Sequence, residues 1–315
     1  MNTPNQRLLK RVEDLGAILR PTPVVRLRYP CMNLYAKLEY CSVVGSIKDR
    51  PAYYMLRDGI RQGAIQQGTT VVESSSGNTS SALAVFCQLL GLTFIAVVDP
   101  NIQGHYLGLL KSTSTQIEYV TEQDDSGGYL NNRLKKVREL LETWDDILWT
   151  NQYNNSSAMT AHYQLTAGEI IETFSELDYV FVGVSTAGTI AGVSQRLKYH
   201  FPNVKVVAVD AVGSRIFGQA PKLRRIPGIG SSIVPGLLKH ALIDDVVHVT
   251  ESDTIKACHE LLWEHQILTG GSSGSAYHAV TNYRYSKLNP TVLFLCADRG
   301  TAYMDTIYNP DWSVS

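Results

Sequence analysis

Short apolar runs alternate with helical patterns along almost the whole chain, and small or polar residues separate one from the next. Runs such as Thr93–Val98 are apolar at successive positions, as expected of strands that are buried on both faces. Helices that connect such strands produce a parallel sheet. The polar stretch 149–157 interrupts the series, and a second series follows it. The sequence therefore predicts an α/β protein with two doubly wound halves.

The expected elements follow from turn residues, caps and periodicity. Predicted strands cover residues 22–27, 33–39, 70–73, 93–98, 117–120, 179–184, 205–209, 245–249 and 291–295. Predicted helices extend to residue 18, from 51 to about 60, and over 80–90, 107–111, 129–144, 161–174, 189–200, 252–266 and 275–288. We place a smaller, mobile α/β domain at 36–148 and a larger domain at 1–35 plus 149–315. Ligands of doubly wound sheets bind at the carboxyl ends of strands, so we expect a cofactor between the two.

Composition and charge exclude several classes of function. The formal net charge of −1 gives no basic field that could hold nucleic acid. The five cysteines form no C-x-x-C pair, which argues against a disulfide framework or a zinc site and favours a reducing compartment. We find no signal peptide and no apolar run of membrane-spanning length. We expect a cytoplasmic protein with no bound metal and with neither a nucleic-acid nor a membrane partner.

Three turns between an expected strand and an expected helix consist of small residues. They read E-S-S-S-G-N-T at 73–79, S-T-A-G-T at 185–189 and G-G-S-S-G at 270–274. Small residues let backbone amides approach an anion, and the helix dipole favours its negative charge. A single turn of this kind is common at strand-to-helix junctions, and N-capping explains Ser76 alone. On the residues alone, these turns are a weak signal for anion binding.

Lys48 lies after a turn marked by Gly45 and Ser46, and a helical pattern begins just beyond it. A cation at a helix N-terminus opposes the helix dipole, which disfavours the charged form. A neutral lysine amine is a nucleophile that can form a Schiff base. Taken alone, a lysine at a helix start is more often a solvated charge.

Together with Lys48, the three turns resemble, in order and spacing, the fold type II pyridoxal-phosphate (PLP) enzymes of the cysteine synthase and cystathionine β-synthase family. The resemblance extends from about Thr22 to about Tyr308. It implies two three-layer α/β/α domains of the tryptophan synthase β-like type, pyridoxal 5'-phosphate as cofactor, and a homodimer. It also implies that the smaller domain carries the substrate-carboxylate loop and the larger one binds the cofactor phosphate.

The resemblance assigns roles to residues of the first domain. Lys48 holds PLP as a Schiff base and later removes the substrate α-proton as a general base. Asn78 contacts the ring oxygen of the cofactor. Ser75, Ser76 and Thr79 receive the α-carboxylate of the substrate through hydroxyls and backbone amides.

In the second domain the resemblance places the cofactor phosphate in the 185–189 turn. Its cofactor-binding residues are Ser185, Thr186, Ala187, Gly188 and Thr189. The family usually has glycines where Ser185 and Ala187 stand, which points to a change on the substrate side of the pocket. Ser272 is placed against the pyridine nitrogen. A neutral hydroxyl there does not hold the ring protonated, which favours β-elimination followed by addition over transamination.

Several stretches depart from ordinary cysteine synthases. They are 127–133, 151–153, 185–189, 209–218 and A-D-R-G-T-A-Y at 297–303. They resemble the branch of the family that joins O-phospho-L-serine to L-glutamate and makes a 2,3-diaminopropionate precursor for siderophores. A phosphate leaving group and a dicarboxylic nucleophile need cationic and hydroxyl donors. Arg133, Tyr153, Ser185 and Arg215 are the candidates, although each taken singly also fits a surface or structural role.

The turn-forming sequence Pro227–Gly230, called the glycine loop below, resembles the family's flexible loop at the mouth of the cleft. Closure would exclude water from the reaction.

Other functions remain open on the residues alone. A cysteine synthase or O-phosphoserine sulfhydrylase would use sulfide and would need no carboxylate clamp. A cystathionine β-synthase with regulatory and haem-binding extensions does not fit the length. A non-catalytic binding or regulatory protein on this fold would not need the lysine. An NAD-binding oxidoreductase would need a G-x-G-x-x-G after the first strand of a half, and neither half has one.

Overall fold

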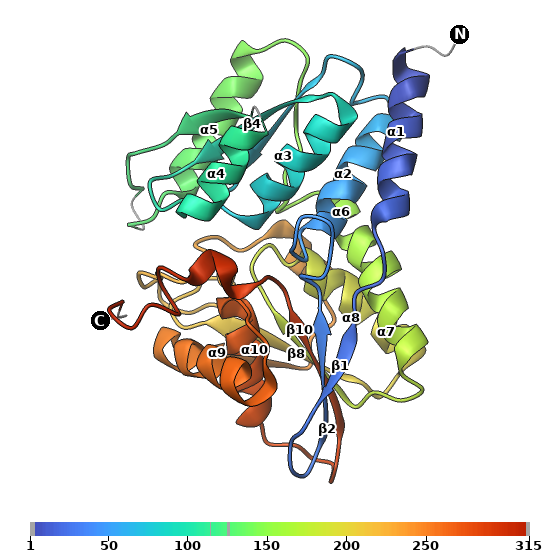
Figure 1. Cartoon of the computed structure of the whole chain (residues 1–315), viewed down its shortest axis with the longest axis vertical. Coiled ribbons are helices and arrows are strands. Elements are labelled where there is room, and N and C mark those ends of the chain that lie inside the picture. The colour runs from blue at the N-terminus through green and yellow to red at the C-terminus, as the bar shows by residue number, and fades with distance from the viewer. Residues whose placement is uncertain (1–3, 114, 125–126, 313–315) are drawn as a thin grey trace. The chain divides into compact units, whose positions relative to one another are not determined.

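The computed structural model describes residues 4–113, 115–124 and 127–312, and these form two compact units (Figure 1). Unit 1 consists of the described residues of Met1–Arg20 and Lys48–Ala158. Unit 2 consists of Pro21–Ile47 and the described residues of Met159–Ser315. Each unit has its own sheet with helices packed on it. The predicted α/β class with parallel sheets is confirmed.

The sheet of unit 1 has the strand order β5-β4-β3-β6, and its described strand pairs are all parallel. Its elements are α1 (Pro4–Ile18), α2 (Asp49–Arg61), β3 (Thr70–Ser74), α3 (Asn78–Leu90), β4 (Thr93–Val98), α4 (Gly104–Ser112), β5 (Gln116–Tyr119), α5 (Leu130–Thr143) and β6 (Ile147–Trp149). The chain moves outward from β3 to β5 and returns as β6 on the other side of β3. Ligand-binding loops of open α/β sheets leave the carboxyl ends of strands at such a reversal.

Unit 2 has the same kind of reversal in a sheet of order β1-β2-β10-β7-β8-β9. Its strands are β1 (Val24–Leu27), β2 (Asn33–Leu38), β7 (Tyr179–Gly183), β8 (Lys205–Ala211), β9 (Asp245–Val249) and β10 (Thr291–Cys296). Only the β1–β2 pair is antiparallel among the described pairs. The chain moves from β7 through β8 to β9 and returns as β10 on the other side of β7.

The helices of unit 2 connect these strands. They are the π-helical turn His162–Thr166, α7 (Ala167–Thr173), α8 (Gly188–His200), α9 (Glu251–His265) and α10 (Gly271–Thr281), with short 3₁₀ turns at Gly236–His240 and Gly300–Tyr303. Helix α6 (Ser156–Ala161) spans the boundary between the units. Thr250 caps α9, because its hydroxyl accepts a hydrogen bond from Asp253 N at 3.1 Å.

The limits of the two units differ from the sequence-based domain limits in three stretches. Residues 4–20 belong to unit 1 because α1 packs against α2 and α3. Residues 149–158 also belong to unit 1, since β6 pairs with β3. Residues 36–47 belong to unit 2, since β2 pairs with β10. The role of each domain in binding cofactor or substrate stays a prediction.

Most predicted elements are found within a few residues of their expected limits, with two exceptions. Strand β6 was not predicted; it has only three residues. Helix α10 begins at Gly271 and ends at Thr281, whereas a helix over 275–288 was predicted, so that prediction was wrong. The chain leaves the helix early because Tyr283 and Tyr285 pack edge-on against the Tyr179 ring, with centroids 5.7 and 4.9 Å away.

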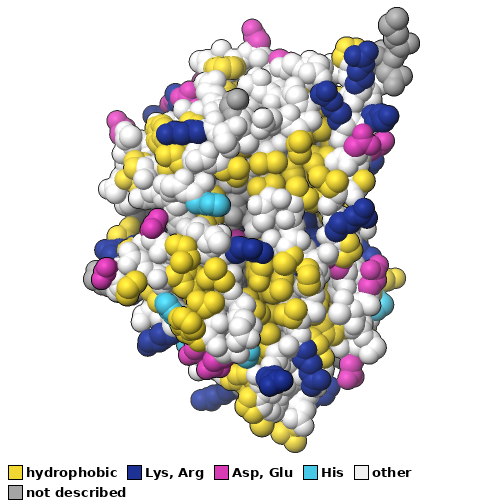
Figure 2. Space-filling view, viewed as in Figure 1, with side chains coloured by type: hydrophobic (Ala, Val, Ile, Leu, Met, Phe, Trp, Pro, Cys, Tyr) yellow, Lys and Arg dark blue, Asp and Glu magenta, His cyan; other side chains and the backbone are white. Residues whose placement is uncertain are grey.

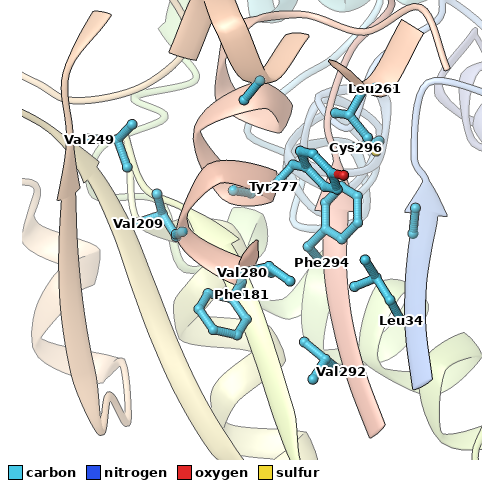
Figure 3. Close-up of a cluster of buried hydrophobic side chains, with 14 of the residues drawn as sticks. Leu34, Phe181, Val209, Val249, Leu261, Tyr277, Val280, Val292, Phe294 and Cys296 are labelled. Atoms are coloured by element: carbon cyan, nitrogen blue, oxygen red, sulfur yellow. The ribbon is translucent and has the colours of Figure 1, made fainter. Parts of the chain in front are cut away.

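The main core of unit 2 lies between its sheet and α9 and α10 (Figure 3). Phe294 of the central strand β10 is fully buried, and its ring centroid lies 5.8 Å from that of Tyr277 on α10. Phe181 and Val209 extend this core across β7 and β8. This core holds α10 against β7, β8 and β10. It thereby fixes the positions of the turns that leave the ends of these strands.

On the face shown in Figure 2, basic and acidic side chains are interspersed over both units, in keeping with the formal net charge of −1. Within the described ranges, none of the helices combines the length and the apolar character that crossing a lipid bilayer requires.

A buried ion cluster ties β2 to α7 inside unit 2. The Nζ atom of Lys37 lies 2.7 Å from Glu169 Oε2 and 3.5 Å from Glu39 Oε1, and the side chains of Lys37 and Glu39 have no exposed surface. Thr22 completes the cluster, because its hydroxyl donates to Glu39 at 2.7 Å and its carbonyl accepts from Lys37. Two carboxylates thus share one cation away from water, so removal of that cation is costly.

We therefore expect Lys37→Ala to lower the free energy of unfolding by about 3–5 kcal/mol, because both carboxylates lose their buried cation. Urea unfolding measures the change. Lys205 serves as the control because it pairs with Asp244 at 3.4 Å while its side chain is 55% exposed. Lys205→Ala should cost less than about 1 kcal/mol. Equal losses in the two variants would contradict the importance of the buried cluster.

Candidate active site

Lys48 of unit 1 is half-buried at the start of α2, where sequence analysis placed it. It is the N-cap residue of the helix, with φ −76° and ψ −13°, and its carbonyl oxygen accepts a hydrogen bond from Ala52 N at 3.0 Å. The residue therefore stands at the positive end of a thirteen-residue helix. This position suits an amine that must be neutral when it reacts.

The turn between β3 and α3 is held by its own backbone and hydroxyls. Ser75 N donates to Val97 O of β4 at 3.1 Å, which anchors the start of the turn to the sheet. Ser80 Oγ donates to Gly77 O at 2.8 Å. Helix α3 begins at Asn78, two residues before its predicted start, so Asn78 and Thr79 lie in its first turn. Backbone amides there can receive a carboxylate.

Gln152 follows β6, the strand that pairs with β3 on the side away from β4. It binds the β3–α3 turn through two hydrogen bonds. Its Oε1 accepts a hydrogen bond from Thr79 Oγ1 at 2.7 Å, and its Nε2 donates to Ser74 O at 3.1 Å. Sequence analysis noted the stretch 151–153 but did not identify Gln152. Recognition of β6 would have revealed it, because a residue after β6 must lie beside the end of β3.

Glu73 holds Gln152 in place from within the sheet. Its Oε2 accepts hydrogen bonds from Gln152 N at 3.1 Å and from Thr150 Oγ1 at 2.7 Å, and its Oε1 accepts from Trp149 Nε1 at 3.2 Å. Burial raises the pKa of the Glu73 carboxyl, whereas these hydrogen bonds act in the opposite direction. The carboxyl is fully buried and has donors on both oxygens, so the start of the β6–α6 connection is rigid.

Arg133 also reaches this turn, from the first part of α5. Its Nη1 donates to Ser76 Oγ at 2.8 Å and lies 3.1 Å from Asp99 Oδ2, while Ser76 Oγ donates to the same carboxylate at 2.9 Å. The Arg133 side chain is only 13% exposed, and its buried Nε atom has no hydrogen-bond partner among the residues that the structure describes. Arg133 is therefore not a solvated surface charge. Tyr153, the other candidate from unit 1, is buried and directly follows Gln152.

In unit 2, the 185–189 turn leaves the carboxyl end of β7 and leads into α8. Ala187 is the N-cap residue and adopts the left-handed conformation, with φ 63° and ψ −2°. A left-handed residue before a helix turns successive amides toward one point, which makes an anion-binding concavity. Helix α8 has thirteen residues, and its dipole favours an anion at the same place. These features fit the phosphate of PLP.

Thr189, the last residue of this turn, is oriented by a buried histidine. His162 Nε2 lies 3.2 Å from Thr189 Oγ1, and His162 Nδ1 lies 3.0 Å from Thr166 Oγ1. His162 lies in the π-helical turn, which sequence analysis described as ordinary helix. No motif in the sequence marks it.

The first turn of α10 lies against the end of β7, which brings Ser272 close to the 185–189 turn. A Cβ atom added at Gly183 would be 3.5 Å from Ser272 Cβ. Ser273 secures α10 there, because its Oγ accepts a hydrogen bond from Ala297 N at 3.0 Å. Ser272 therefore lies beside the strand end from which the 185–189 turn leaves, both in unit 2, whereas Lys48 and the β3–α3 turn belong to unit 1.

The glycine loop rests on the 185–189 turn. Ser185 Oγ donates to Gly230 O at 3.1 Å, and Gly230 N donates to Val184 O at 2.8 Å. Arg215 is exposed, unlike Arg133. Arg224, which sequence analysis did not select, packs closely on Gly230, and its Nη2 donates to Ser232 Oγ at 3.2 Å.

Ala187 yields a testable prediction, because the left-handed region costs an alanine about 1–2 kcal/mol. Ala187→Gly should raise the free energy of unfolding by up to about 1 kcal/mol, after the greater freedom of unfolded glycine is subtracted. Chemical denaturation measures the change. Ala191→Gly, in the interior of the same helix, should instead lower stability by about 0.5–1 kcal/mol. Destabilisation by both substitutions would show that Ala187 is not strained.

The chain is similar to known proteins over most of its length. The family model described as pyridoxal-phosphate dependent enzyme matches residues 17–298. The N-(2-amino-2-carboxyethyl)-L-glutamate synthase of Ralstonia nicotianae is 42% identical over 282 residues, which cover 89% of this chain and 83% of that protein. The synthase of the same name from Cupriavidus metallidurans is 42% identical over 310 residues, covering 96% and 90%.

Among solved structures, the O-acetylserine dependent cystathionine beta-synthase from Helicobacter pylori matches with a TM-score of 0.85 and 26% identity, over 92% of this chain and 96% of that one. The family match spans most of the chain, and both curated relatives exceed 40% identity. The chain therefore belongs to the family of pyridoxal-phosphate-dependent enzymes.

Proposed function

We propose that this enzyme joins O-phospho-L-serine to L-glutamate, giving N-(2-amino-2-carboxyethyl)-L-glutamate and phosphate. The bond between the serine β-carbon and the phosphate oxygen breaks, and a bond between that carbon and the glutamate nitrogen forms. The glutamate amine gives up a proton. The name of two relatives at 42% identity supports this product. This product would serve as a 2,3-diaminopropionate precursor in siderophore synthesis. We also expect the enzyme to act as a homodimer.

The features of each unit, taken by itself, support the binding of one part of the cofactor. Bound PLP supplies an electron sink for the substrate α-carbon. Lys48 Nζ would hold the cofactor and then move the α-proton, with Asn78 on the ring oxygen and Ser272 at the pyridine nitrogen. The amides of the 185–189 turn would bind its phosphate. The neutral hydroxyl of Ser272 favours loss of a β-leaving group over transamination.

The observation that carries the choice of substrate is the setting of Arg133. One side of its guanidinium is engaged by Ser76 and Asp99, while the buried Nε has no partner. Nε and Nη2 form the edge that binds an oxyanion with two parallel hydrogen bonds. A second anionic group of the substrates, such as the leaving phosphate, would bind this edge while Ser75, Ser76 and Thr79 receive the α-carboxylate.

Three further side chains are proposed to assist. Tyr153 and Ser185 would donate hydroxyl hydrogen bonds to phosphate oxygens. Arg215 is proposed here as the cation for glutamate, because its exposure suits a nucleophile that enters last. Arg224 is a second cation for the same role, because it packs against Gly230 of the glycine loop.

The proposal predicts the products of a matched set of reactions. Purified enzyme receives O-phospho-L-serine or O-acetyl-L-serine, each with L-glutamate or sulfide, and mass spectrometry identifies the products. We expect the glutamate adduct from phosphoserine to form fastest. Lys48→Ala should abolish both this product and the visible absorbance of lysine-bound PLP. Cysteine as the main product, with no glutamate adduct, would instead establish a sulfhydrylase.

The role of Arg133 predicts a loss specific to the anionic substrate. Arg133→Lys keeps the charge but cannot present two parallel donors, so kcat/KM for O-phospho-L-serine should fall about ten- to a hundredfold. The cofactor absorbance should stay unchanged. Arg138→Lys, at an exposed position of the same helix, is the control and should have no effect. An unchanged kcat/KM in Arg133→Lys would remove this residue from the substrate site.

A further inference from the structure

Tyr106 lies in the first turn of α4, outside every motif that the sequence analysis selected. It is 4% exposed, and α4 packs against α3. Its hydroxyl donates to Asn78 Oδ1 at 3.0 Å. Its ring lies beside the β3–α3 turn, since Cε2 would be 3.9 Å from a Cβ atom added at Gly77. Tyr106 therefore contacts the turn at two neighbouring residues.

The hydrogen bond from Tyr106 goes with one of the two orientations of the Asn78 amide. An asparagine side chain has an acceptor oxygen on one side and a donor NH₂ on the other, and rotation about its last bond exchanges them. In the structure the phenolic proton is given to Oδ1, so the oxygen lies on the Tyr106 side. Nδ2 then faces the opposite side as a hydrogen-bond donor. Hydrogen bonding at the carbonyl oxygen also polarises the amide, which strengthens Nδ2 as a donor.

The orientation matters for the ring oxygen of PLP, which is an anionic or hydrogen-bonded phenolic oxygen and needs a donor. An amide rotated by half a turn would present Oδ1 to it, and two acceptors would then face each other. The side-chain orientation of Asn78 thus decides whether the contact attracts or repels the cofactor.

We propose that Tyr106 is a positioning residue that holds Asn78 Nδ2 toward the cofactor ring oxygen. This inference rests on the proposed contact between Asn78 and PLP, and it is independent of the substrates proposed above. A buried tyrosine with a purely structural role would also find a partner for its hydroxyl. The two roles differ in what the loss of that hydroxyl does to the cofactor.

The test starts with Tyr106→Phe in the holoenzyme, which removes the hydroxyl and keeps the ring. We expect the dissociation constant of PLP to rise about three- to tenfold, the range that one lost hydrogen bond gives. The visible absorption band of the bound cofactor should shift. Tyr285→Phe is the control, because the Tyr285 hydroxyl donates to Val280 O at 2.7 Å in unit 2, near the C-terminal end of α10. It should change neither quantity.

A double-mutant cycle then asks whether Tyr106 acts through Asn78. In an Asn78→Ala background, Tyr106→Phe should have no further effect on cofactor affinity or band position, because the amide to be oriented is gone. Additive effects would overturn the inference. The inference would also be overturned if Tyr106→Phe left the PLP affinity and the absorption band unchanged while Asn78→Ala weakened PLP binding. If Asn78→Ala itself leaves affinity and absorbance unchanged, the Asn78 contact is wrong and the inference falls with it, whatever the product assay gives.

Discussion

The reversal of strand order in each sheet is the constraint on which the site depends. Parallel strands end at one edge of a sheet, and the chain must leave that edge through a loop before it enters the next helix. The returning strands, β6 in unit 1 and β10 in unit 2, pair beside the first strands of their series. In unit 1 this pairing brings Gln152 against Thr79, more than seventy positions apart in the chain. Without the pairing of β6 with β3, Gln152 and Thr79 would not be brought into contact.

The buried cations Lys37 and Arg133 both pair with nearby carboxylates. The number of carboxylates around each cation limits its capacity to bind a further anion. Lys37 is surrounded by two carboxylates, so it has no capacity for a ligand. Arg133 has only one carboxylate, Asp99, and retains a buried Nε. An anion at this edge competes with Asp99 for one guanidinium, so a doubly charged phosphate gains more there than a neutral ester does. In the proposed reaction, the pair would therefore favour an anionic leaving group over an acetyl group.

The sequence predicts the fold and the small-residue turns because both depend on local patterns. Apolar runs mark Thr93–Val98 as a strand, and a positive-φ glycine ends α3 at Gly91. The sequence does not predict contacts that depend on tertiary pairing. Gln152 was missed because β6 has three residues, and Tyr106 because a buried aromatic on an amphipathic helix looks like any core residue. Motifs identify the turn that binds, and the side chains that orient it have no local signature.

Those orienting side chains form a consistent arrangement around the β3–α3 turn. Arg133 of α5 holds Ser76, Tyr106 of α4 holds Asn78, and Gln152 after β6 holds Thr79. Each comes from a different later element of the same unit, so the turn cannot change shape without breaking bonds to three parts of the fold. A site that is already ordered loses less conformational entropy when it binds its ligand. These three contacts, all within unit 1, therefore preorganise the turn.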